Sequence, residues 1–242
     1  RIIDQMGTGL GVTFVNGVTF TEADGAFFSG GNKSTAPYAN IDQFSLHSSI
    51  TIEVYFKFNT SSSMGRIFSS GDGQGSNNFT FGRYSSNNYI GVYTNVSNWD
   101  YHSHSSQNKI VNGTYMHVVV TATPSGGSIY TNHGHHYRYS SNNLINPGTR
   151  NYYYLARSIY NWDNPNMNML YFRFWNGVEL NSNEVEDLYQ NINTRHFYSE
   201  LSQNNSIVHL NNKNITSGKF TSLSSANYVD IDISTKSVRF ND

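Results

Sequence analysis

A regular alternation of apolar and polar residues is the feature that most limits how this chain can fold. Between residues 50 and 58 every second side chain is apolar, and the residues between them are Thr, Glu, Tyr and Lys. Successive side chains of a β-strand point to opposite faces of its sheet, so a period of two is typical of a strand with one buried face. The pattern recurs over residues 116–123 and 170–175. The sequence therefore predicts antiparallel sheets with one face on the core and the other toward solvent.

Turn signals divide the rest of the chain into further segments of strand length. Asn16-Gly17, Asn112-Gly113 and Asn176-Gly177 are dipeptides typical of tight turns. Many short strands at close spacing favour an antiparallel sandwich or barrel. We expect the additional strands at residues 12–20, 66–69, 79–84, 89–93, 128–132, 152–157, 207–210, 228–233 and 237–240.

One segment departs from the alternation and predicts a short helix near residues 182–192. Asn181 is an N-cap acceptor and Glu184 follows three residues later, which is the capping-box arrangement. Val185 and Leu188 then fall at helical spacing. Carboxylates in the first turns are favoured by the helix dipole, so we expect this local group of acids to be structural rather than catalytic.

The charge balance excludes several classes of function. The 242 residues include 15 Lys and Arg against 16 Asp and Glu, and charged residues make up 13% of the chain, about half the usual 25%. Without a basic surplus we expect no nucleic-acid partner. The chain has no Cys and no apolar run of about 20 residues, so we expect neither disulfides nor membrane insertion.

The aromatic content argues against disorder and points to a neutral, polar partner. Aromatic residues make up 15% of the chain, whereas disordered chains are poor in them. The polarity of the sequence comes mainly from Asn, Ser, Thr and Tyr. Such an uncharged surface that can form hydrogen bonds suits carbohydrate, other polar polymers or packed assemblies.

The order of these elements is similar to that of one known superfamily. The similarity is carried by residues 128–134 and by Asp24-Gly25-Ala26-Phe27-Phe28, Ser49-Ile50-Thr51-Ile52-Glu53-Val54-Tyr55, Met116-His117-Val118-Val119-Val120-Thr121, Leu170-Tyr171-Phe172-Arg173-Phe174-Trp175 and Leu180-Asn181-Ser182-Asn183-Glu184-Val185. In this succession the chain resembles the laminin-G-like, concanavalin A-like lectin and glucanase jelly-roll superfamily. The resemblance covers residues 10–192, and it depends on order and spacing rather than on one sharp motif.

The resemblance implies an all-β fold, a two-sheet antiparallel jelly-roll sandwich. It also implies glycan binding, which in some members involves calcium, although other members are adhesive, structural or hydrolytic. We expect one domain over residues 1–242, with residues 193–242 forming terminal strands of the sandwich. The alternative is that residues 217–240, which loosely echo residues 24–52, begin a second repeat. Because the sequence starts at Arg1, we expect a processed product or an excised domain.

The distribution of carboxylates favours a non-catalytic role. Glycoside hydrolysis needs two carboxylates about 5–9 Å apart, and enzymes of the superfamily that this chain resembles carry a Glu-x-Asp-x-x-Glu motif on one strand. The sequence lacks this motif, and Glu53 is the single acid of its predicted strand. It also lacks a Gly-x-Ser-x-Gly elbow. We therefore expect no enzyme, with a hydrolase built from acids of distant strands as the alternative.

The tripeptide Asn-Trp-Asp occurs twice, at residues 98–100 and 161–163. We expect both copies in loops between strands, and Pro165 in the second loop. An exposed Trp or Tyr can stack on a sugar ring while neighbouring Asn and Asp bind its hydroxyls. The alternative is that both tryptophans pack inward. The predicted ligand-binding residues are Trp99, Asp100, Tyr101, His102, His104, Trp162, Asp163 and Asn164.

Two groups of polar residues are candidate metal ligands. Histidines cluster at residues 102–104 and 133–136, and a spacing of two would place pairs on one strand face. An exposed hairpin tip near His133 is the simpler explanation for the second cluster. Asp163 and Asn166 lie in an oxygen-rich run that suits calcium, although it holds a single carboxylate. Calcium is therefore the one cofactor that the sequence suggests.

These observations favour a non-catalytic module of a larger protein that binds a glycan or a glycosylated cell surface. Its expected location is extracellular, or on the surface of a virion or cell. One alternative is a structural or attachment domain of a viral or surface assembly, whose partners would be other subunits. The other is a polysaccharide hydrolase or lyase.

Overall fold

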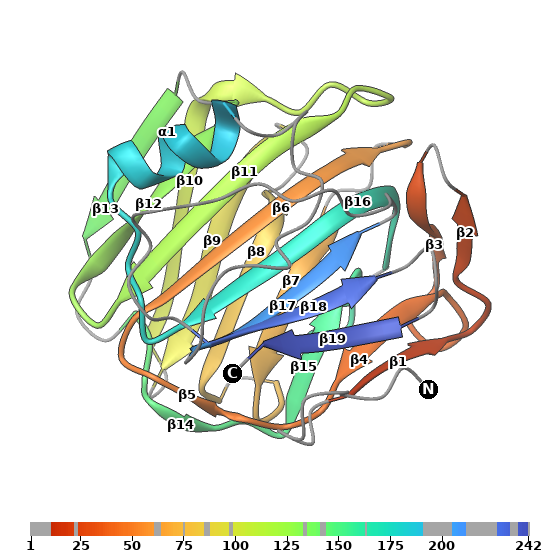
Figure 1. Cartoon of the computed structure of the whole chain (residues 1–242), viewed down its shortest axis with the longest axis horizontal. Coiled ribbons are helices and arrows are strands. Elements are labelled where there is room, and N and C mark those ends of the chain that lie inside the picture. Colours follow the sequence, from red (N-terminus) through yellow and green to blue (C-terminus); the bar gives the residue numbers. More distant parts are fainter. Residues whose placement is uncertain are drawn as a thin grey trace.

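A computed structural model describes residues 11–21, 24–60, 64–74, 76–84, 88–96, 99–132, 135–140, 144–162, 164–190, 205–211, 227–232 and 237–241. It places the side chains of these residues except for residues 96, 99–108, 135–136 and those after 204. Two antiparallel sheets of seven strands each are stacked face to face (Figure 1). This arrangement confirms the predicted all-β sandwich of two antiparallel sheets.

We call the two sheets sheet I and sheet II. Sheet I contains, in spatial order, β1 (Val12–Val15), β4 (Tyr38–Ile41), β15 (Tyr152–Leu155), β7 (Arg66–Gly71), β8 (Asn78–Tyr84), β9 (Tyr89–Val96) and β10 (Trp99–Lys109). Sheet II contains β13 (His135–Ser140), β12 (Gly126–Thr131), β11 (Met116–Thr123), β6 (Ile50–Phe58), β16 (Asn164–Asn176), β3 (Gly25–Gly31) and β2 (Thr19–Thr21). A two-stranded sheet of β5 (Ser45–Leu46) and β14 (Gly148–Thr149) lies at one end.

Aromatic side chains fill the space between the two sheets. Phe68 of sheet I stacks on Phe172 of sheet II with ring centroids 5.7 Å apart, and it lies equally close to Phe174. All three side chains are buried. Burying one such side chain contributes roughly 1.5–3 kcal/mol, so much of the aromatic excess in the sequence stabilises the core.

Two segments that the sequence assigns to loops are strands. Residues 99–109 form β10, which pairs with β9 at the edge of sheet I. Its run of His, Ser and Gln has no apolar alternation because an edge strand is held by backbone hydrogen bonds to a single neighbour. Pro165 lies within β16, where the strand pairs only with β3 and has not yet reached β6. A residue without an N–H group is tolerated at such a position.

Two residues of the second histidine cluster lie in a strand beside the predicted hairpin turn. His135 and His136 belong to β13 and pair with Thr131 and Tyr130 of β12. Asn132, at the start of the turn, has a φ of 46°, a left-handed conformation that Asn tolerates. His133 lies outside the described residues. The predicted turn near His133 thus lies between β12, which ends at Thr131, and β13, which begins at His135.

The predicted capping box forms at the start of α1 (Ser182–Gln190). The Oδ1 atom of Asn181 accepts hydrogen bonds from the backbone N–H groups of Asn183 (2.9 Å) and Glu184 (3.2 Å). The Oε2 atom of Glu184 accepts one from the N–H of Asn181 in return (2.8 Å). These bonds satisfy helix donors that have no intrahelical partner.

Within the described residues, no helix is long and apolar enough to cross a membrane.

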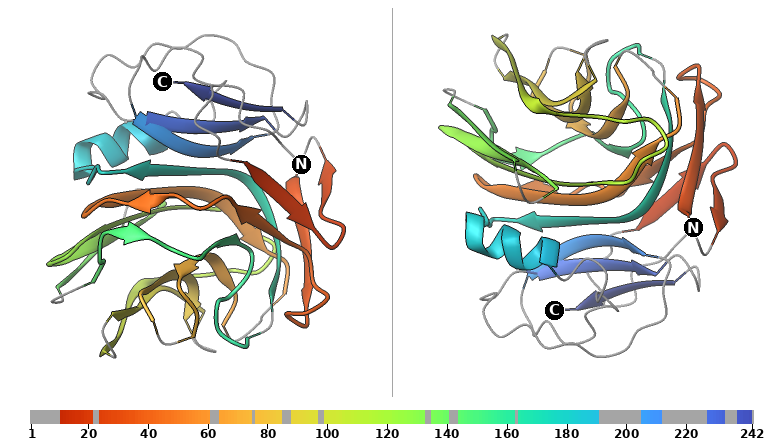
Figure 2. Two further views of the ribbon diagram at one scale, coloured as in Figure 1. Left: turned by 90° about the horizontal axis from the view of Figure 1, so that it is seen from below. Right: turned by 90° about the horizontal axis from the view of Figure 1, so that it is seen from above.

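The outer face of sheet II is covered, which corrects the expectation that β6 meets solvent on that side. Figure 2 shows α1 and the C-terminal strands on the same side of this sheet. Val185 and Leu188 of α1 pack against Trp175 and Val119. Thr51 and Glu53, which the alternation places on the outer face of β6, are both buried. Strand periodicity predicts which residues share a face, but not what packs on that face.

Burial of this face encloses a charged network around Glu53. Its Oε1 atom lies 2.8 Å from His117 Nε2 and accepts a hydrogen bond from the Tyr171 hydroxyl (3.1 Å). Its Oε2 atom pairs with Arg173 Nη1 at 3.1 Å. All four residues are buried. Glu53 is thus the acceptor for groups from two neighbouring strands, and it is not accessible as a catalytic acid.

The C-terminal strands form a third sheet. β17 (Asn205–Asn211) pairs in parallel with β18 (Asn227–Asp232), which pairs with β19 (Ser237–Asn241) in antiparallel fashion. β17 lies beside β16 on the outer side of sheet II (Figure 2). The predicted terminal strands are present, but the described ones pair with each other rather than extending either large sheet. The single-domain assignment and its second-repeat alternative both stay predictions.

Asp24→Asn should destabilise the fold in a pH-dependent way. Lys57 Nζ lies 2.5 Å from Asp24 Oδ1, and the Tyr115 hydroxyl donates to the same atom (2.9 Å). Two hydrogen bonds lower the pKa of Asp24 below its usual value of 3.8, and the one from Lys57 has a larger effect than the one from Tyr115. A carboxyl whose pKa is lower in the folded state stabilises above its unfolded pKa and loses that effect as pH falls through the folded value.

The expected loss from Asp24→Asn is about 0.5–1 kcal/mol at pH 7, because the pair is partly exposed. The difference between wild type and variant should shrink as the pH falls below about 4. Urea unfolding across this range measures it, with Tyr115→Phe as the control that removes one of the two hydrogen bonds. A destabilisation independent of pH would contradict the assignment.

Candidate functional site

A row of polar residues runs across the outer face of sheet I, on the far side of the molecule from α1 (Figure 2). Directly paired residues of neighbouring strands share a sheet face. The register pairs one residue from each strand, and we call this set the polar row. It consists of Thr13, Asn40, Tyr154, Ser69, Thr80, Tyr93 and, by the register of its strand, His102.

Residues 156–162 cross over the middle of the polar row, and we call them the covering loop. The Asn78 side chain on β8 donates from Nδ2 to the Tyr160 hydroxyl (2.9 Å). At the start of the loop, Ala156 donates its N–H to the Ile67 carbonyl (2.9 Å) and has a φ of 56°. Ser69 and Thr80, in the middle of the polar row, are completely buried. The loop is therefore held on the sheet by specific hydrogen bonds.

A cluster of aromatic rings and one cation lies at the loop's C-terminal end. The Trp162 and Tyr160 rings are stacked with centroids 4.7 Å apart, and Tyr93 meets Tyr160 edge-on at 4.9 Å. The Arg66 guanidinium lies 4.5 Å from the Trp162 ring centroid. Burial lowers the pKa of Arg66 to about 10, so it stays charged at neutral pH. We call these four residues the Trp162 cluster.

A second aromatic group, the tyrosine patch, lies at the N-terminal end of the loop. It consists of Tyr38, Tyr152, Tyr154 and Arg157. Tyr152 and Tyr154 are stacked at 5.6 Å, and Tyr38 meets Tyr154 edge-on at 5.5 Å. Arg157 lies 4.0 Å from the Tyr38 ring and 5.0 Å from the Tyr154 ring. Tyr152 is 41% exposed, so the patch presents a flat aromatic surface to solvent.

The structure brings the two predicted Asn-Trp-Asp segments to the same region of sheet I. Tyr93 links them, because its ring lies 6.0 Å from that of Trp162 and its backbone pairs with His102. Asp100 and His104 pair with Asn95 and Gly91 of β9 in the same way. Trp99 and Tyr101 take the intervening positions opposite Val96 and Thr94. The side chains of residues 99–108 of β10 and Asp163 are not among those described.

Trp162 and Asn164 differ in their accessibility. Trp162 is half-buried, and its ring is contacted by Tyr160 and Arg66, which leaves part of it at the surface. Asn164 is buried, and its Nδ2 atom donates to the Pro37 carbonyl (3.4 Å). Of these two predicted ligand contacts, only Trp162 is at the surface.

Asn166, one of the two predicted calcium ligands, lies near the start of β16. Asn166 Oδ1 and Asn168 Oδ1 each accept a hydrogen bond from Asn59 Nδ2 at 2.9 Å. Calcium would have to replace these bonds. Asp163 lies outside the described residues, and no group of three His, Asp or Glu side chains suited to a metal occurs among those that the structure places. Calcium binding stays a prediction.

Several residues of this face were not singled out from the sequence. The tyrosine patch and Arg66 come from strands and loops that become neighbours only in the fold. The run Tyr152-Tyr153-Tyr154 was the available signal, because alternate residues of a strand share a face. Tyr153 indeed points into the core, where its hydroxyl donates to the Phe44 carbonyl (2.7 Å).

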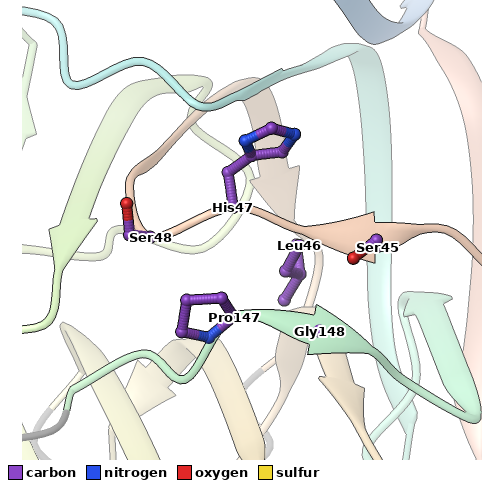
Figure 3. Close-up of a pocket in the computed structure, with 6 residues that line it drawn as sticks. All are labelled: Ser45, Leu46, His47, Ser48, Pro147 and Gly148. Atoms are coloured by element: carbon purple, nitrogen blue, oxygen red, sulfur yellow. The ribbon is translucent and has the colours of Figure 1, made fainter.

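A shallow open cavity of about 480 Å³ lies elsewhere, between β5 and β14 (Figure 3). Its lining is formed by Ser45, Leu46, His47, Ser48, Pro147 and Gly148. The Asn176 side chain fixes the backbone here, since it accepts from the His47 N–H (2.9 Å) and donates to the Ser45 carbonyl (2.9 Å). Figure 3 shows the His47 ring pointing away from Pro147. The cavity lacks the stacked aromatic rings of sheet I, which makes it the weaker candidate.

Gly71→Ala should displace the covering loop without changing a residue of the polar row. A methyl group at Gly71 would collide with Asn78 Oδ1 and lie 2.9 Å from Ile159 Cδ1. Both neighbours are buried, so overpacking should cost about 1–3 kcal/mol. Thermal unfolding measures the loss, and faster proteolysis within residues 156–162 should accompany it. In Gly73→Ala the methyl group meets no atom within 4 Å, but the φ of 142° strains any side chain, so this variant measures a backbone cost that Gly71 does not have. An unchanged rate of proteolysis within residues 156–162 in Gly71→Ala would argue against the loop contact.

The comparisons with known proteins agree with this architecture. The family model described as the concanavalin A-like lectin/glucanases superfamily matches residues 28–186. No curated protein matches the sequence significantly.

Among solved structures, the chain resembles binding domains of botulinum neurotoxins. A type DC binding domain in complex with SialylT has a TM-score of 0.58 and 14% identity, with 83% of this chain and 50% of that one covered. The same type in complex with rat synaptotagmin II has a TM-score of 0.56 and 14% identity (82% and 50% covered). A type C structure, from work on cell entry that depends on two ganglioside molecules, has a TM-score of 0.55 and 14% identity (82% and 49% covered). This chain thus spans about half of those structures, and the likeness shows a shared fold.

Proposed function

Because the chain belongs to the concanavalin A-like lectin/glucanase superfamily, we propose that it is a non-catalytic carbohydrate-binding module that recognises cell surfaces. Its binding surface is the outer face of sheet I. The observation that carries the proposal is the pair of aromatic groups at the two ends of the covering loop, the tyrosine patch with its exposed Tyr152 and the Trp162 cluster with its partly exposed Trp162. The module acts outside the cell or on a surface, where such glycans are found.

The chemistry of this face suits a sugar. Aromatic rings present flat apolar surfaces to the C–H faces of a pyranose, and hydroxyl, amide and guanidinium groups bind its hydroxyls. Tyr152 offers such a ring at the surface, and Arg157 lies beside it on Tyr154. The neurotoxin domains of similar fold, whose names mention gangliosides, SialylT and synaptotagmin, give a precedent for surface recognition.

The same face argues against glycoside hydrolysis. That reaction needs two carboxylates about 5–9 Å apart. The described side chains of the polar row, the tyrosine patch and the Trp162 cluster are hydroxyls, amides, aromatic rings and guanidinium groups. Glu53, the acid considered from the sequence, lies buried on the other sheet.

Saturation-transfer NMR and a glycan array with the purified chain test the proposal, with and without calcium. Tyr152→Ala should weaken glycan binding about 5–10-fold, as expected for loss of a stacked aromatic ring. Tyr137→Ala is the matched control, because Tyr137 is 37% exposed but belongs to β13 of sheet II. If no sugar binds at concentrations on the order of 1 mM, or if both variants lose affinity equally, the proposal is wrong.

A further inference from the structure

Two cations meet at the tyrosine patch. The Lys33 ammonium donates to the carbonyl of Ile159 in the covering loop (2.7 Å). Ile159 is two residues after Arg157, so this bond holds the ammonium group beside the segment that carries the guanidinium. Burial, and to a smaller extent the charge of Arg157, lower the pKa of Lys33. Arg157 itself lies on the Tyr38 and Tyr154 rings. The covering loop therefore brings together two like charges that are 124 positions apart in the sequence.

Neither cation has an acidic partner among the side chains that the structure places. The ion pairs found there join Lys57 to Asp24, and His117 and Arg173 to Glu53. The Arg157 Nε atom is buried without a hydrogen-bond partner in the same set. Like charges close together are unfavourable, and a buried donor without an acceptor costs about 1–3 kcal/mol. An anion bound between the two groups would relieve both costs.

The location of Lys33 and Arg157 determines which group the anionic ligand must contain besides its acid. Tyr152 is the exposed ring of the patch, and it stacks on Tyr154, over which Arg157 lies. A ligand that reaches both cations therefore also meets an aromatic surface. The planar guanidinium binds carboxylate and sulfate through paired hydrogen bonds, whereas lysine acts as a point charge.

We propose that this patch binds an anionic glycan, whose carboxylate or sulfate lies between Lys33 and Arg157 while a sugar ring packs on Tyr152. The inference rests on the proposed function and specifies its substrate class. It requires an acidic sugar rather than a neutral one. The acid can belong to a free oligosaccharide or to the headgroup of a glycolipid, because both present the same chemistry.

The test compares an acidic sugar with its neutral counterpart by calorimetry on the full chain. Sialyllactose and a sulfated lactose should each bind at least 10-fold more tightly than lactose, and this preference should fall as salt rises. Lys33→Gln and Arg157→Gln should each reduce the preference at least 10-fold. Lys109→Gln is the matched control, since Lys109 also lies over a tyrosine ring, that of Tyr89 at 5.8 Å. It should leave the preference unchanged.

Binding to lipid vesicles distinguishes a glycolipid headgroup from a free oligosaccharide as the source of the acidic group. Binding to vesicles that contain a sialylated glycolipid, together with weak binding of free sialyllactose, assigns the site to a membrane-linked headgroup. Equal binding to phosphatidylserine vesicles would show that any anion suffices, which would overturn the proposal of an anionic glycan.

Two further outcomes separate this inference from the proposed function. If acidic and neutral sugars bind equally, and the two Gln variants behave as wild type, the anionic inference fails while glycan binding stands. If no sugar binds although circular dichroism shows an intact fold, the proposed function fails as well. Arg157 packs on two rings, so Lys33→Gln provides the result that does not depend on the packing of the patch.

Discussion

Glu53→Ala is expected to lower the free energy of unfolding by about 3–5 kcal/mol. The substitution removes a buried carboxylate that His117, Tyr171 and Arg173 share. Breaking a buried charge network by removing one member is far more costly than replacing the whole network, because polar partners are left in a medium of low dielectric constant. A typical domain is stable by only 5–15 kcal/mol, so this one change removes a large share.

Urea unfolding followed by tryptophan fluorescence measures this loss. Glu179→Ala is the matched control, since it removes an exposed glutamate next to the same region and should change stability by less than about 0.5 kcal/mol. Glu53→Gln keeps an acceptor but removes the charge, so its loss should lie between the two. A loss below 1 kcal/mol for Glu53→Ala would show that the network contributes little.

Trp175→Ala is the second change with a large expected effect, about 3–5 kcal/mol. Trp175 is almost completely buried between sheet II and α1, where it packs against Val185 and Leu188. Removing the indole leaves a cavity that the sheet cannot close, and α1 loses the surface on which it is held. A nine-residue helix is too short to be stable without such packing.

Hydrogen exchange should show which elements Trp175 stabilises. In Trp175→Ala, the amides of α1 should lose protection before those of β6 and β11. Trp162→Ala is the control, because Trp162 is half-buried on the other side of the molecule and should cost only about 1–2 kcal/mol. Uniform loss of protection over the whole chain would mean that α1 and sheet II unfold as one unit.

The alternation of residues predicts the strands that face the core, and it fails where a strand has no core face. β6 and β11 have the bounds expected from the sequence, because their inward residues are all apolar. The sequence predicts a loop where β10 begins, since the polar residues of this strand carry no period and its pairing depends on β9. The burial of Glu53 also could not be predicted, because its cover consists of elements more than 100 residues further along the chain.

The residues of the candidate site also divide into those that the sequence predicts and those that only the fold brings together. The sequence predicts Trp162 as a ligand contact because its tripeptide with Asn and Asp occurs twice and combines an aromatic ring with polar groups, and Trp162 does lie at the surface. Arg157 and Lys33 were missed because each is an ordinary basic residue in the sequence. Their proximity depends on the covering loop reaching β3 and β4, which no local pattern encodes. A site made of distant residues therefore needs the fold before it can be recognised.

The polar row draws one residue from each of seven strands, over residues 13 to 154. No excised hairpin or peptide can reproduce this face, so the smallest unit that could bind in the proposed way is the assembled sandwich. A ligand that binds the folded chain alone also stabilises it, by about 2.7 kcal/mol when present at 100 times its Kd. Where the ligand concentration is high, binding would therefore also increase resistance to heat and proteases. A chain that unfolds would lose the whole binding face in one step.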